Sequence, residues 1–200
     1  MKKLSLLKIT TAFLLASVMQ AEVGINVIAN SGSGRYLDSS GSALADGSLL
    51  RFGALNIASY NALSAGDKQS FGSVDALFTQ LGTVTASSGS FLSIGQNTYT
   101  LPASGVNSGD KLYVWVFNNA VAASASEWGI FSSSSVQWNM PVDPNTNTLS
   151  TATIDNIIAG GSLGSSTTEY TLSAVPEPST YALFAGTLAL AWVAIRRRRA

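Results

Sequence analysis

Apolar and polar residues alternate in several short segments of the chain, which is the pattern of β-strands with one buried face. The segment 23–27 (VGINV) places valine and isoleucine at every second position. The segments 49–55 (LLRFGAL) and 169–174 (EYTLSA) are similarly rich in apolar residues and are bounded by glycine, serine and asparagine. The pattern therefore predicts three strands separated by turns.

The segment 111–118 (KLYVWVFN) is the strongest strand candidate because both of its faces are apolar. Leu112, Val114 and Val116 would share one face, and Tyr113, Trp115 and Phe117 would share the other. A strand of this kind is usually central in a sheet that is covered on both sides. The sequence predicts such a position for this strand.

The segment 73–81 (SVDALFTQL) departs from the two-residue period. Its apolar residues fall at the spacing of an amphipathic helix, namely Val74, Leu77, Phe78 and Leu81. Ser73 is a candidate N-cap, and Asp75 would then lie in the first turn. A helix this short needs a sheet to pack against. We therefore predict a mainly β chain, an antiparallel β-sandwich or jelly-roll-like domain with one short amphipathic helix.

The first 21 residues have the pattern of a secretory signal peptide. Lys2, Lys3 and Lys8 precede an apolar stretch that runs from about residue 9 to residue 19, and Ala21 offers a small residue for cleavage. We expect a signal peptide over residues 1–21 and export through Sec-type machinery. A buried N-terminal helix is the alternative interpretation.

The composition limits the chemistry of the exported part. The chain contains neither cysteine nor histidine, which excludes disulfides, thiol nucleophiles, Ser-His-Asp triads and Cys/His zinc sites. Between residues 22 and 175 there are four basic and ten acidic residues, a net charge of −6. An acidic chain with scattered cations is a poor ligand for phosphates, so no nucleic acid partner is expected. No cofactor and no metal are predicted.

Two tryptophans are candidates for contacts with a glycan, because sugar rings stack on aromatic faces. Trp138 stands beside Asn139 and Pro141, where exposure is plausible, and Trp128 is the second candidate. Core packing is the competing interpretation, since large aromatic side chains dominate the cores of small domains.

The acidic residues of the same region support only weak predictions. Asp143 opens a stretch (DPNTNT) that resembles the start of a calcium loop, but Thr148 and Ile154 stand where an EF-hand requires glycine and glutamate. A turn is therefore predicted, with a calcium site of another kind left open. Glu127 and Asp143 are the nearest carboxylates to the tryptophans, and they are the candidates for a polysaccharide hydrolase.

The C-terminal segment combines three features. Pro176, Glu177 and Pro178 form a Pro-Glu-Pro motif, and residues 180–195 follow as sixteen uncharged residues, about 24 Å long as a helix. This is slightly short for a bilayer core but compatible with a transmembrane helix. The cluster Arg196, Arg197, Arg198 and Arg199 then acts as a cytoplasmic stop signal. The expected organisation is a signal peptide (1–21), a β-rich domain (22–174) and a sorting segment (175–200).

This order of motif, apolar helix and arginine cluster closely resembles the PEP-CTERM sorting signal of exported bacterial proteins. The resemblance covers about residues 175–200. It implies that an exosortase, a membrane enzyme with a nucleophilic cysteine, recognises residues 176–178 and processes the chain nearby. The chain would be its substrate, in bacteria that often produce extracellular polysaccharide. A permanent single-pass anchor without processing is the alternative.

These observations lead to three functional hypotheses. We expect a non-enzymatic protein of the cell surface or extracellular matrix, with a structural or adhesive role, that begins as an inner-membrane-anchored precursor. A carbohydrate-binding module that contacts extracellular polysaccharide is the first alternative, and a polysaccharide hydrolase is the second.

Overall fold

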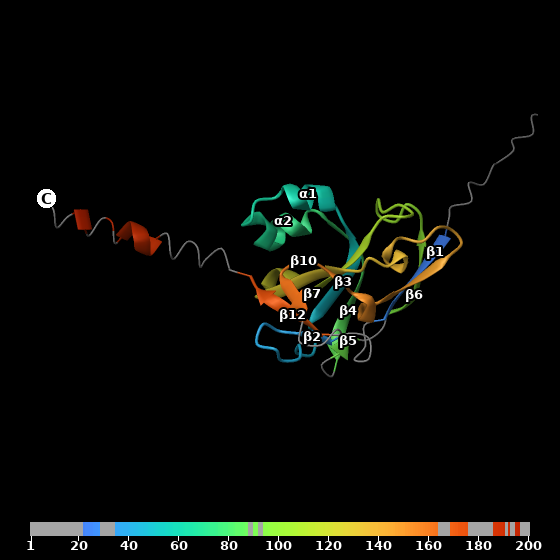
Figure 1. Ribbon diagram of the computed structural model, residues 1–200, viewed down its shortest axis with the longest axis horizontal. Coiled ribbons are helices and arrows are strands. Elements are labelled where there is room, and N and C mark those ends of the chain that lie inside the picture. The colour runs from blue at the N-terminus through green and yellow to red at the C-terminus, as the bar shows by residue number, and fades with distance from the viewer. Residues whose placement is uncertain are drawn as a thin grey trace, which may run out of the picture.

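The structure is a computed structural model, and it describes residues 22–28, 35–87, 90–91, 94–163, 169–175, 186–190, 192 and 195–196. The strands are β1 (Glu22–Ile28), β2 (Arg35–Leu37), β3 (Leu49–Leu55), β4 (Phe78–Ser87), β5 (Ser90–Phe91), β6 (Ile94–Thr100), β7 (Leu112–Phe117), β8 (Glu127–Ser132), β9 (Thr146–Ser150), β10 (Asn156–Ala159), β11 (Gly161–Leu163) and β12 (Glu169–Ala174). The helices are α1 (Ile57–Ala62) and α2 (Phe71–Asp75), with short 3₁₀ turns η1 (Asp67–Gln69), η2 (Ala122–Ser124), η3 (Val136–Trp138) and η4 (Thr151–Thr153). The chain is mainly β, as predicted (Figure 1).

A nine-stranded sheet forms the centre of the molecule. Its main order is β11-β12-β8-β7-β3-β4-β5, with β10 paired to β8 and β2 paired to β12. The predicted strands at residues 49–55 and 169–174 are confirmed as β3 and β12, and the predicted strand at 111–118 is β7. β7 lies between β3 and β8, so its predicted central position is also confirmed.

The alternating side chains of β7 contribute to two separate apolar clusters. Leu112, Val114 and Val116 belong to the first cluster, which also holds Trp138, Tyr170 and the buried residues of β1. Tyr113, Trp115 and Phe117 belong to the second. All six of these side chains are at most 4% exposed. The sheet is therefore buried on both faces at its centre, as the two apolar faces of β7 require.

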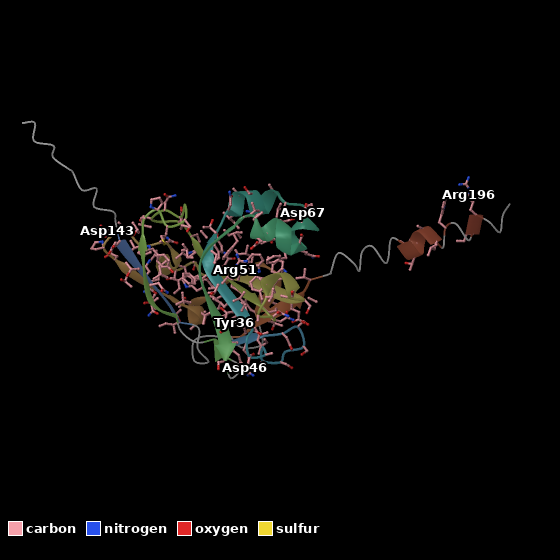
Figure 2. The ribbon with its side chains drawn as sticks, turned by 180° about the vertical axis from the view of Figure 1, so that it is seen from behind. Tyr36, Asp46, Arg51, Asp67, Asp143 and Arg196 are labelled. Carbon is pink, nitrogen blue, oxygen red and sulfur yellow. The ribbon has the colours of Figure 1, made fainter. Side chains whose placement is uncertain are left out.

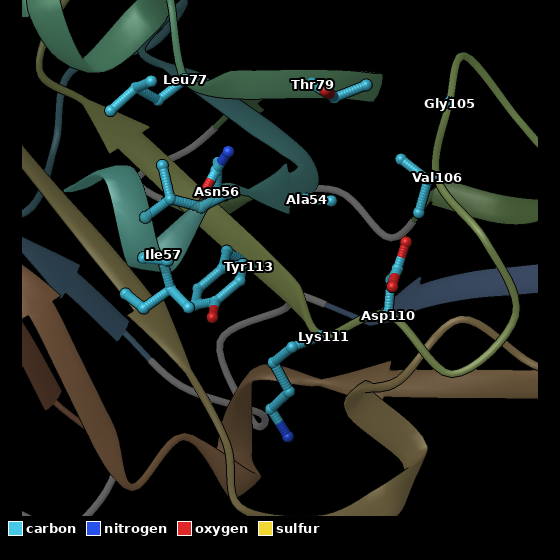
Figure 3. Close-up of a pocket in the computed structure, with 12 residues that line it drawn as sticks. Ala54, Asn56, Ile57, Leu77, Thr79, Gly105, Val106, Asp110, Lys111 and Tyr113 are labelled. Atoms are coloured by element: carbon cyan, nitrogen blue, oxygen red, sulfur yellow. The ribbon is translucent and has the colours of Figure 1, made fainter. Parts of the chain in front are cut away.

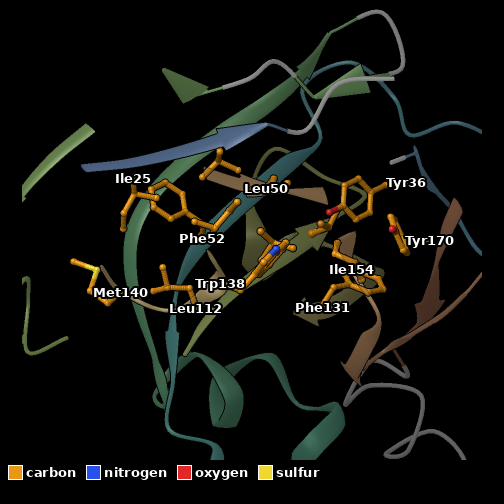
Figure 4. Close-up of a cluster of buried hydrophobic side chains, with 14 of the residues drawn as sticks. Ile25, Tyr36, Leu50, Phe52, Leu112, Phe131, Trp138, Met140, Ile154 and Tyr170 are labelled. Atoms are coloured by element: carbon orange, nitrogen blue, oxygen red, sulfur yellow. The ribbon is translucent and has the colours of Figure 1, made fainter. Parts of the chain in front are cut away.

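The first cluster joins the large sheet to a three-stranded sheet of order β6-β1-β9 (Figure 4). Val23, Ile25 and Val27 of β1 point into this cluster and are at most 1% exposed, which confirms the predicted strand at 23–27. The expectation of purely antiparallel sheets is wrong, because β1 pairs with β9 in parallel and β12 pairs with β2 in parallel. Parallel neighbours need long connections, and both pairs join segments more than 100 residues apart.

Helices α1 and α2 cover the opposite face of the large sheet (Figure 1). The predicted helix at 73–81 is wrong in its extent, and the part of the domain that the structure describes holds a second helix, α1, that was not predicted. Helix α2 starts after Ser70 and ends at Asp75, and the chain enters β4 at Phe78. Phe78 pairs with Leu55 of β3 and is 7% exposed. The ladder between β3 and β4 thus overrides the local helical spacing.

The terminal predictions concern segments that are mostly outside the described residues. The signal peptide (1–21), the motif at 176–178 and Arg197 to Arg199 lie there. In the C-terminal segment the described residues 186–190, 192, 195 and 196 are helical, and the Arg196 guanidinium lies 5.3 Å from the centre of the Trp192 ring. Within the described part of the chain, no helix has both the length and the apolar character needed to cross a membrane.

Candidate functional site

The last strand of the domain, β12, is firmly held in the large sheet. It lies between β11 and β8 and also pairs with β2. Tyr170 and Leu172 are at most 1% exposed, and the Tyr170 hydroxyl donates a hydrogen bond to the Thr151 carbonyl over 2.7 Å. Removing β12 from the sheet would expose both side chains and break this bond, so β12 is an integral part of the fold.

The sheet contacts continue to the residue before the Pro-Glu-Pro motif. Ala174 pairs with Glu127 of β8, and the Val175 N–H donates a hydrogen bond to the Ser126 carbonyl over 2.8 Å. The Val175 side chain is half-buried against the second apolar cluster. Pro176 follows Val175 directly in the sequence. The motif therefore follows directly after the last described residue of the domain.

Glu127 is hydrogen-bonded to two other segments at this end of the domain. Its carboxylate accepts hydrogen bonds from the Ser39 N–H at 2.8 Å and from the Ser39 hydroxyl at 2.6 Å. Asn118 exchanges backbone and side-chain hydrogen bonds with Ser126 and Glu127 over 3.0–3.1 Å. We call the surface formed by Ser39, Ser126, Glu127 and Val175 the exit edge.

The loop that carries Ser39 is also stabilised by a carboxylate. Asp38 accepts hydrogen bonds from the Ser40 N–H, the Ser40 hydroxyl and the Ser42 N–H at 2.6–2.9 Å. These donors, first of all the Ser40 hydroxyl, lower the pKa of the Asp38 carboxyl. The loop therefore keeps a negative charge and a defined shape beside the exit edge. Sequence analysis missed this site, because the contact between Ser39 and Glu127 spans 88 residues and leaves no local pattern.

The two tryptophans predicted to contact a glycan are both buried, which corrects that prediction. Trp138 is 0% exposed within the first cluster, and its indole N–H donates to the Thr153 hydroxyl over 2.9 Å. Trp128 is 1% exposed and packs edge to face against Trp115, with ring centres 5.5 Å apart. Neither indole presents a face to solvent, so neither can act as a stacking platform for a sugar.

Glu127 and Asp143, the two predicted carboxylates, lie at different ends of the domain. Glu127 starts β8, whereas Asp143 lies beside β1, where it accepts a hydrogen bond from the Glu22 N–H over 3.2 Å (Figure 2). Three residues before Asp143, the Met140 N–H donates a hydrogen bond to the Asp110 carbonyl, just before β7 begins. The start of β7 is adjacent to the end of β8 that lies opposite to Glu127, and β8 is about 17 Å long. A glycosidase pair needs carboxylates within roughly 10 Å of each other, which this pair does not provide.

The stretch that resembles a calcium loop forms the predicted turn. The Asn145 N–H donates to the Val142 carbonyl over 2.8 Å, and β9 begins at the next residue. Asp143 is occupied by the main chain of β1. Among the residues that the structure describes, no group of three or more acidic side chains gathers in a way that could hold a metal ion.

A groove of about 450 Å³ opens between the start of α1, the adjoining ends of β3 and β4, and the loop before β7 (Figure 3). Its charged lining residues are Asp110 and Lys111. The Asp110 carboxylate accepts from the Asn107 N–H at 2.7 Å, and the Lys111 ammonium donates to the Ser135 carbonyl at 3.2 Å. Partial burial lowers the pKa of Lys111, while the nearby Asp155 carboxylate opposes that shift. Through these hydrogen bonds both charged side chains hold loops beside the groove.

Comparison with known families identifies the C-terminal segment. Residues 174–199 match the PEP-CTERM protein-sorting motif, so this chain carries that sorting signal, as its sequence predicted. The match implies an exported, membrane-anchored precursor that an exosortase processes and that is sorted to the cell surface. No curated protein matched the chain. No solved structure matched it either.

Proposed function

We propose that this chain is an exosortase substrate whose β-domain is delivered to the cell surface or extracellular matrix, where it has a structural or adhesive role without enzymatic activity. The observation that carries the proposal is the position of the sorting signal. The match to the PEP-CTERM motif starts at the final residue of β12 and covers the sequence that follows it, to residue 199.

The domain's two apolar clusters support the interpretation that the tail is a sorting signal and not a part of the folded domain. The buried residues of both clusters come from positions 23 to 172, and among the described residues Val175 is the last one packed against either cluster. Removal of the chain beyond Val175 would therefore leave the described core complete. A domain of about 150 residues can be stable on such a core without disulfides.

The tail's own sequence supplies the two functions that a temporary anchor needs. Residues 180–195 are uncharged and supply the membrane segment, and the four arginines that follow favour the cytoplasmic side. The Sec-type signal expected at residues 1–21 would direct the acidic domain to the other side. With a net charge of −6, the released domain would have little attraction to an anionic membrane.

A non-enzymatic role is supported by the chemistry of the domain. Histidine and cysteine are absent from the sequence, and the carboxylates Glu127 and Asp143 are held in separate hydrogen-bond networks. The buried positions of Trp128 and Trp138 remove the residues on which the carbohydrate-binding alternative was based. Contact with extracellular polysaccharide would then use the polar surface of the domain.

The first experiment is intact mass spectrometry of the protein from its native host, separated into membrane, surface and medium fractions. We expect a surface or medium species that begins near Glu22 and ends near Pro178. A triple variant with Pro176, Glu177 and Pro178 changed to alanine should remain in the membrane with its full tail. A wild-type protein that keeps Arg196 to Arg199 in every fraction would instead show a permanent anchor and refute the proposal.

A further inference from the structure

The main-chain nitrogen of Glu22, the residue expected to follow signal-peptide cleavage, lies beside a carboxylate. This nitrogen is 3.2 Å from Asp143 Oδ1 and donates a hydrogen bond to it (Figure 2). Both residues are exposed, and 121 positions separate them in the sequence. The contact therefore exists only in the folded domain.

The pairing of β1 with β9 fixes the position of this nitrogen. In their parallel ladder the Gly24 N–H donates to the Asn145 carbonyl over 3.1 Å. Hydrogen bonds in a parallel ladder are evenly spaced, so the Glu22 N–H, two residues earlier, faces position 143. That position lies before β9 begins, and the Asp143 carboxylate takes the place of a backbone acceptor there. Val23 is 1% exposed and anchors the strand directly after Glu22.

The Asp143 carboxylate carries a charge that this contact does not yet balance. A neutral amide N–H is satisfied by a neutral carbonyl, as the bond from Gly24 to Asn145 illustrates. Within the described part of the chain, Asp143 makes no ion pair, and the Glu22 N–H is its one hydrogen-bond donor. A full negative charge is thus held against a single main-chain nitrogen.

Cleavage of the signal peptide after Ala21 would supply the matching cation. When water hydrolyses the peptide bond between Ala21 and Glu22, its hydroxyl joins the Ala21 carbonyl carbon, which leaves as a carboxylate. The proton from water and the proton of the new carboxyl group go to the Glu22 nitrogen, which becomes an α-ammonium. Such a group has a pKa of about 7.7–8.0 and is mainly charged at neutral pH. Hydrogen bonds between charged groups are roughly twice as strong as neutral ones.

We propose that Asp143 is a binding site for the mature N-terminus: the α-ammonium created at Glu22 pairs with the Asp143 carboxylate and fastens β1 between β6 and β9. The inference rests on the export step of the proposed function, since it requires cleavage after Ala21. It adds that removal of the signal peptide stabilises the folded domain, because the mature chain gains an ion pair that the precursor lacks. Because both groups are exposed, the gain is modest and depends on salt.

The test varies the N-terminus and the carboxylate independently in the full-length precursor, expressed in the native host. Insertion of Glu-Ser between Ala21 and Glu22 leaves glutamate after the cleavage point but moves the new ammonium two residues away from Asp143. Asp143→Asn, which keeps a neutral acceptor, is made with and without the insertion. Mass spectrometry of the exported proteins establishes their first residue.

Thermal unfolding of these four proteins measures the coupling. We expect Asp143→Asn to lower the midpoint temperature by about 2–4 °C with the natural N-terminus, and by less than half as much with the insertion. Equal losses in the two backgrounds would show that Asp143 serves only as an acceptor for an N–H group, and would overturn the inference.

The reactivity of the α-amine gives a second measurement on the folded protein. A carboxylate beside an amine favours its protonated form, and only the unprotonated form reacts with an acetylating reagent. At pH 7 we expect acetylation of the Glu22 amine to be at least about threefold slower in the wild type than in Asp143→Asn. The side-chain carboxylate of Glu22 is present in both proteins and cancels. Equal rates at low salt would contradict the pairing.

The two ends of the chain are read separately from the same mass spectra. A mature protein that starts at a residue other than Glu22 would overturn this inference and leave processing by the exosortase intact. A protein that starts at Glu22 but keeps Arg196 to Arg199 in every fraction would refute the proposed function. The unfolding and acetylation data would then still decide whether Asp143 binds the N-terminus.

Discussion

The Arg51 guanidinium joins the helical layer to the central sheet through Asp75. Its Nη1 lies 2.5 Å from Asp75 Oδ1 at the end of α2. The Arg51 side chain is 12% exposed, and its guanidinium carbon lies 5.3 Å from the ring centres of both Phe78 and Trp115. The Arg51 cation on the sheet thus lies between two aromatic rings, and Asp75 at the end of α2 neutralises its charge.

This arrangement predicts a stability loss when only the acid is removed. Asp75→Ala would leave the Arg51 charge largely buried without its partner, and we expect the free energy of unfolding to fall by about 1–3 kcal/mol. Arg51→Met/Asp75→Ala, which removes both charges, should be less destabilised than the sum of the two single variants. Urea unfolding of all four proteins measures the coupling. Strict additivity would show that the ion pair contributes nothing.

Burial of Trp138 predicts a structural role for this side chain. Trp138→Phe should lower the unfolding free energy by about 1–3 kcal/mol, and Trp138→Ala by about 3–5 kcal/mol, because the smaller side chains leave a cavity and lose the hydrogen bond to the Thr153 hydroxyl. Thr153→Val tests the hydrogen-bond part separately, since it removes the hydroxyl that accepts from the indole N–H. Wild-type stability in Trp138→Ala would contradict the buried position.

A pair of glycines tests the close packing of β3 against β4. A Cβ at Gly53 would overlap the Thr79 carbonyl oxygen, at the point where the register between the strands shifts. Gly53→Ala should therefore destabilise the domain by more than about 2 kcal/mol. Gly72 lies in α2 with open space around its Cα, so Gly72→Ala should be neutral or stabilising by up to about 1 kcal/mol. Thermal unfolding of the two variants should give opposite shifts.

The serine-bound carboxylates predict a loss of stability in acid. Hydrogen bonds lower the pKa of Asp38, from Ser40 above all, and that of Asp155, from Ser134 above all. A carboxyl whose pKa is lower in the folded state stabilises the fold above its unfolded pKa of about 3.9, and this contribution disappears as the pH falls through the folded pKa. We therefore expect the midpoint temperature of thermal unfolding to decrease as the pH is lowered from about 5 to about 2.

The variant Asp38→Asn/Asp155→Asn gives the matched comparison. It should be less stable than the wild type at pH 7. It should also lose less stability on acidification, because an asparagine at either position cannot take up a proton. Parallel pH profiles for the two proteins would show that other carboxylates dominate acid unfolding.

The features that could be predicted from the sequence are those with a strong local pattern. Two apolar faces along β7 can be satisfied only at the centre of a covered sheet, and this strand was placed correctly. β1, β3 and β12 are recognisable from short alternating or apolar segments bounded by turn residues. The sorting signal was also recognisable from sequence, because an enzyme and a membrane act on a linear order of residues.

The predictions that failed depend on contacts between distant segments. The spacing of Val74, Leu77 and Phe78 fits a helix locally, but pairing of Phe78 with Leu55 gives a strand. Trp138 stands between Gln137 and Asn139, yet it is 0% exposed in the first cluster, whose other members include residues of β1, β7 and β12. Neither outcome is contained in the neighbouring sequence, because burial is decided by what packs against a residue.

By itself, the sequence determined that this chain is mainly β, that it has one strand buried on both faces, and that it carries a PEP-CTERM sorting signal. Tertiary structure alone decided the parallel pairing of β1 with β9, the burial of Trp128 and Trp138, and the exit edge built by Ser39 and Glu127. The physical reason is the range of the interactions involved. Side-chain period and motif order are properties of neighbouring residues. The pairing of β1 with β9 and the contact between Ser39 and Glu127 join segments 88 or more residues apart, and the burial of both tryptophans requires the assembled clusters.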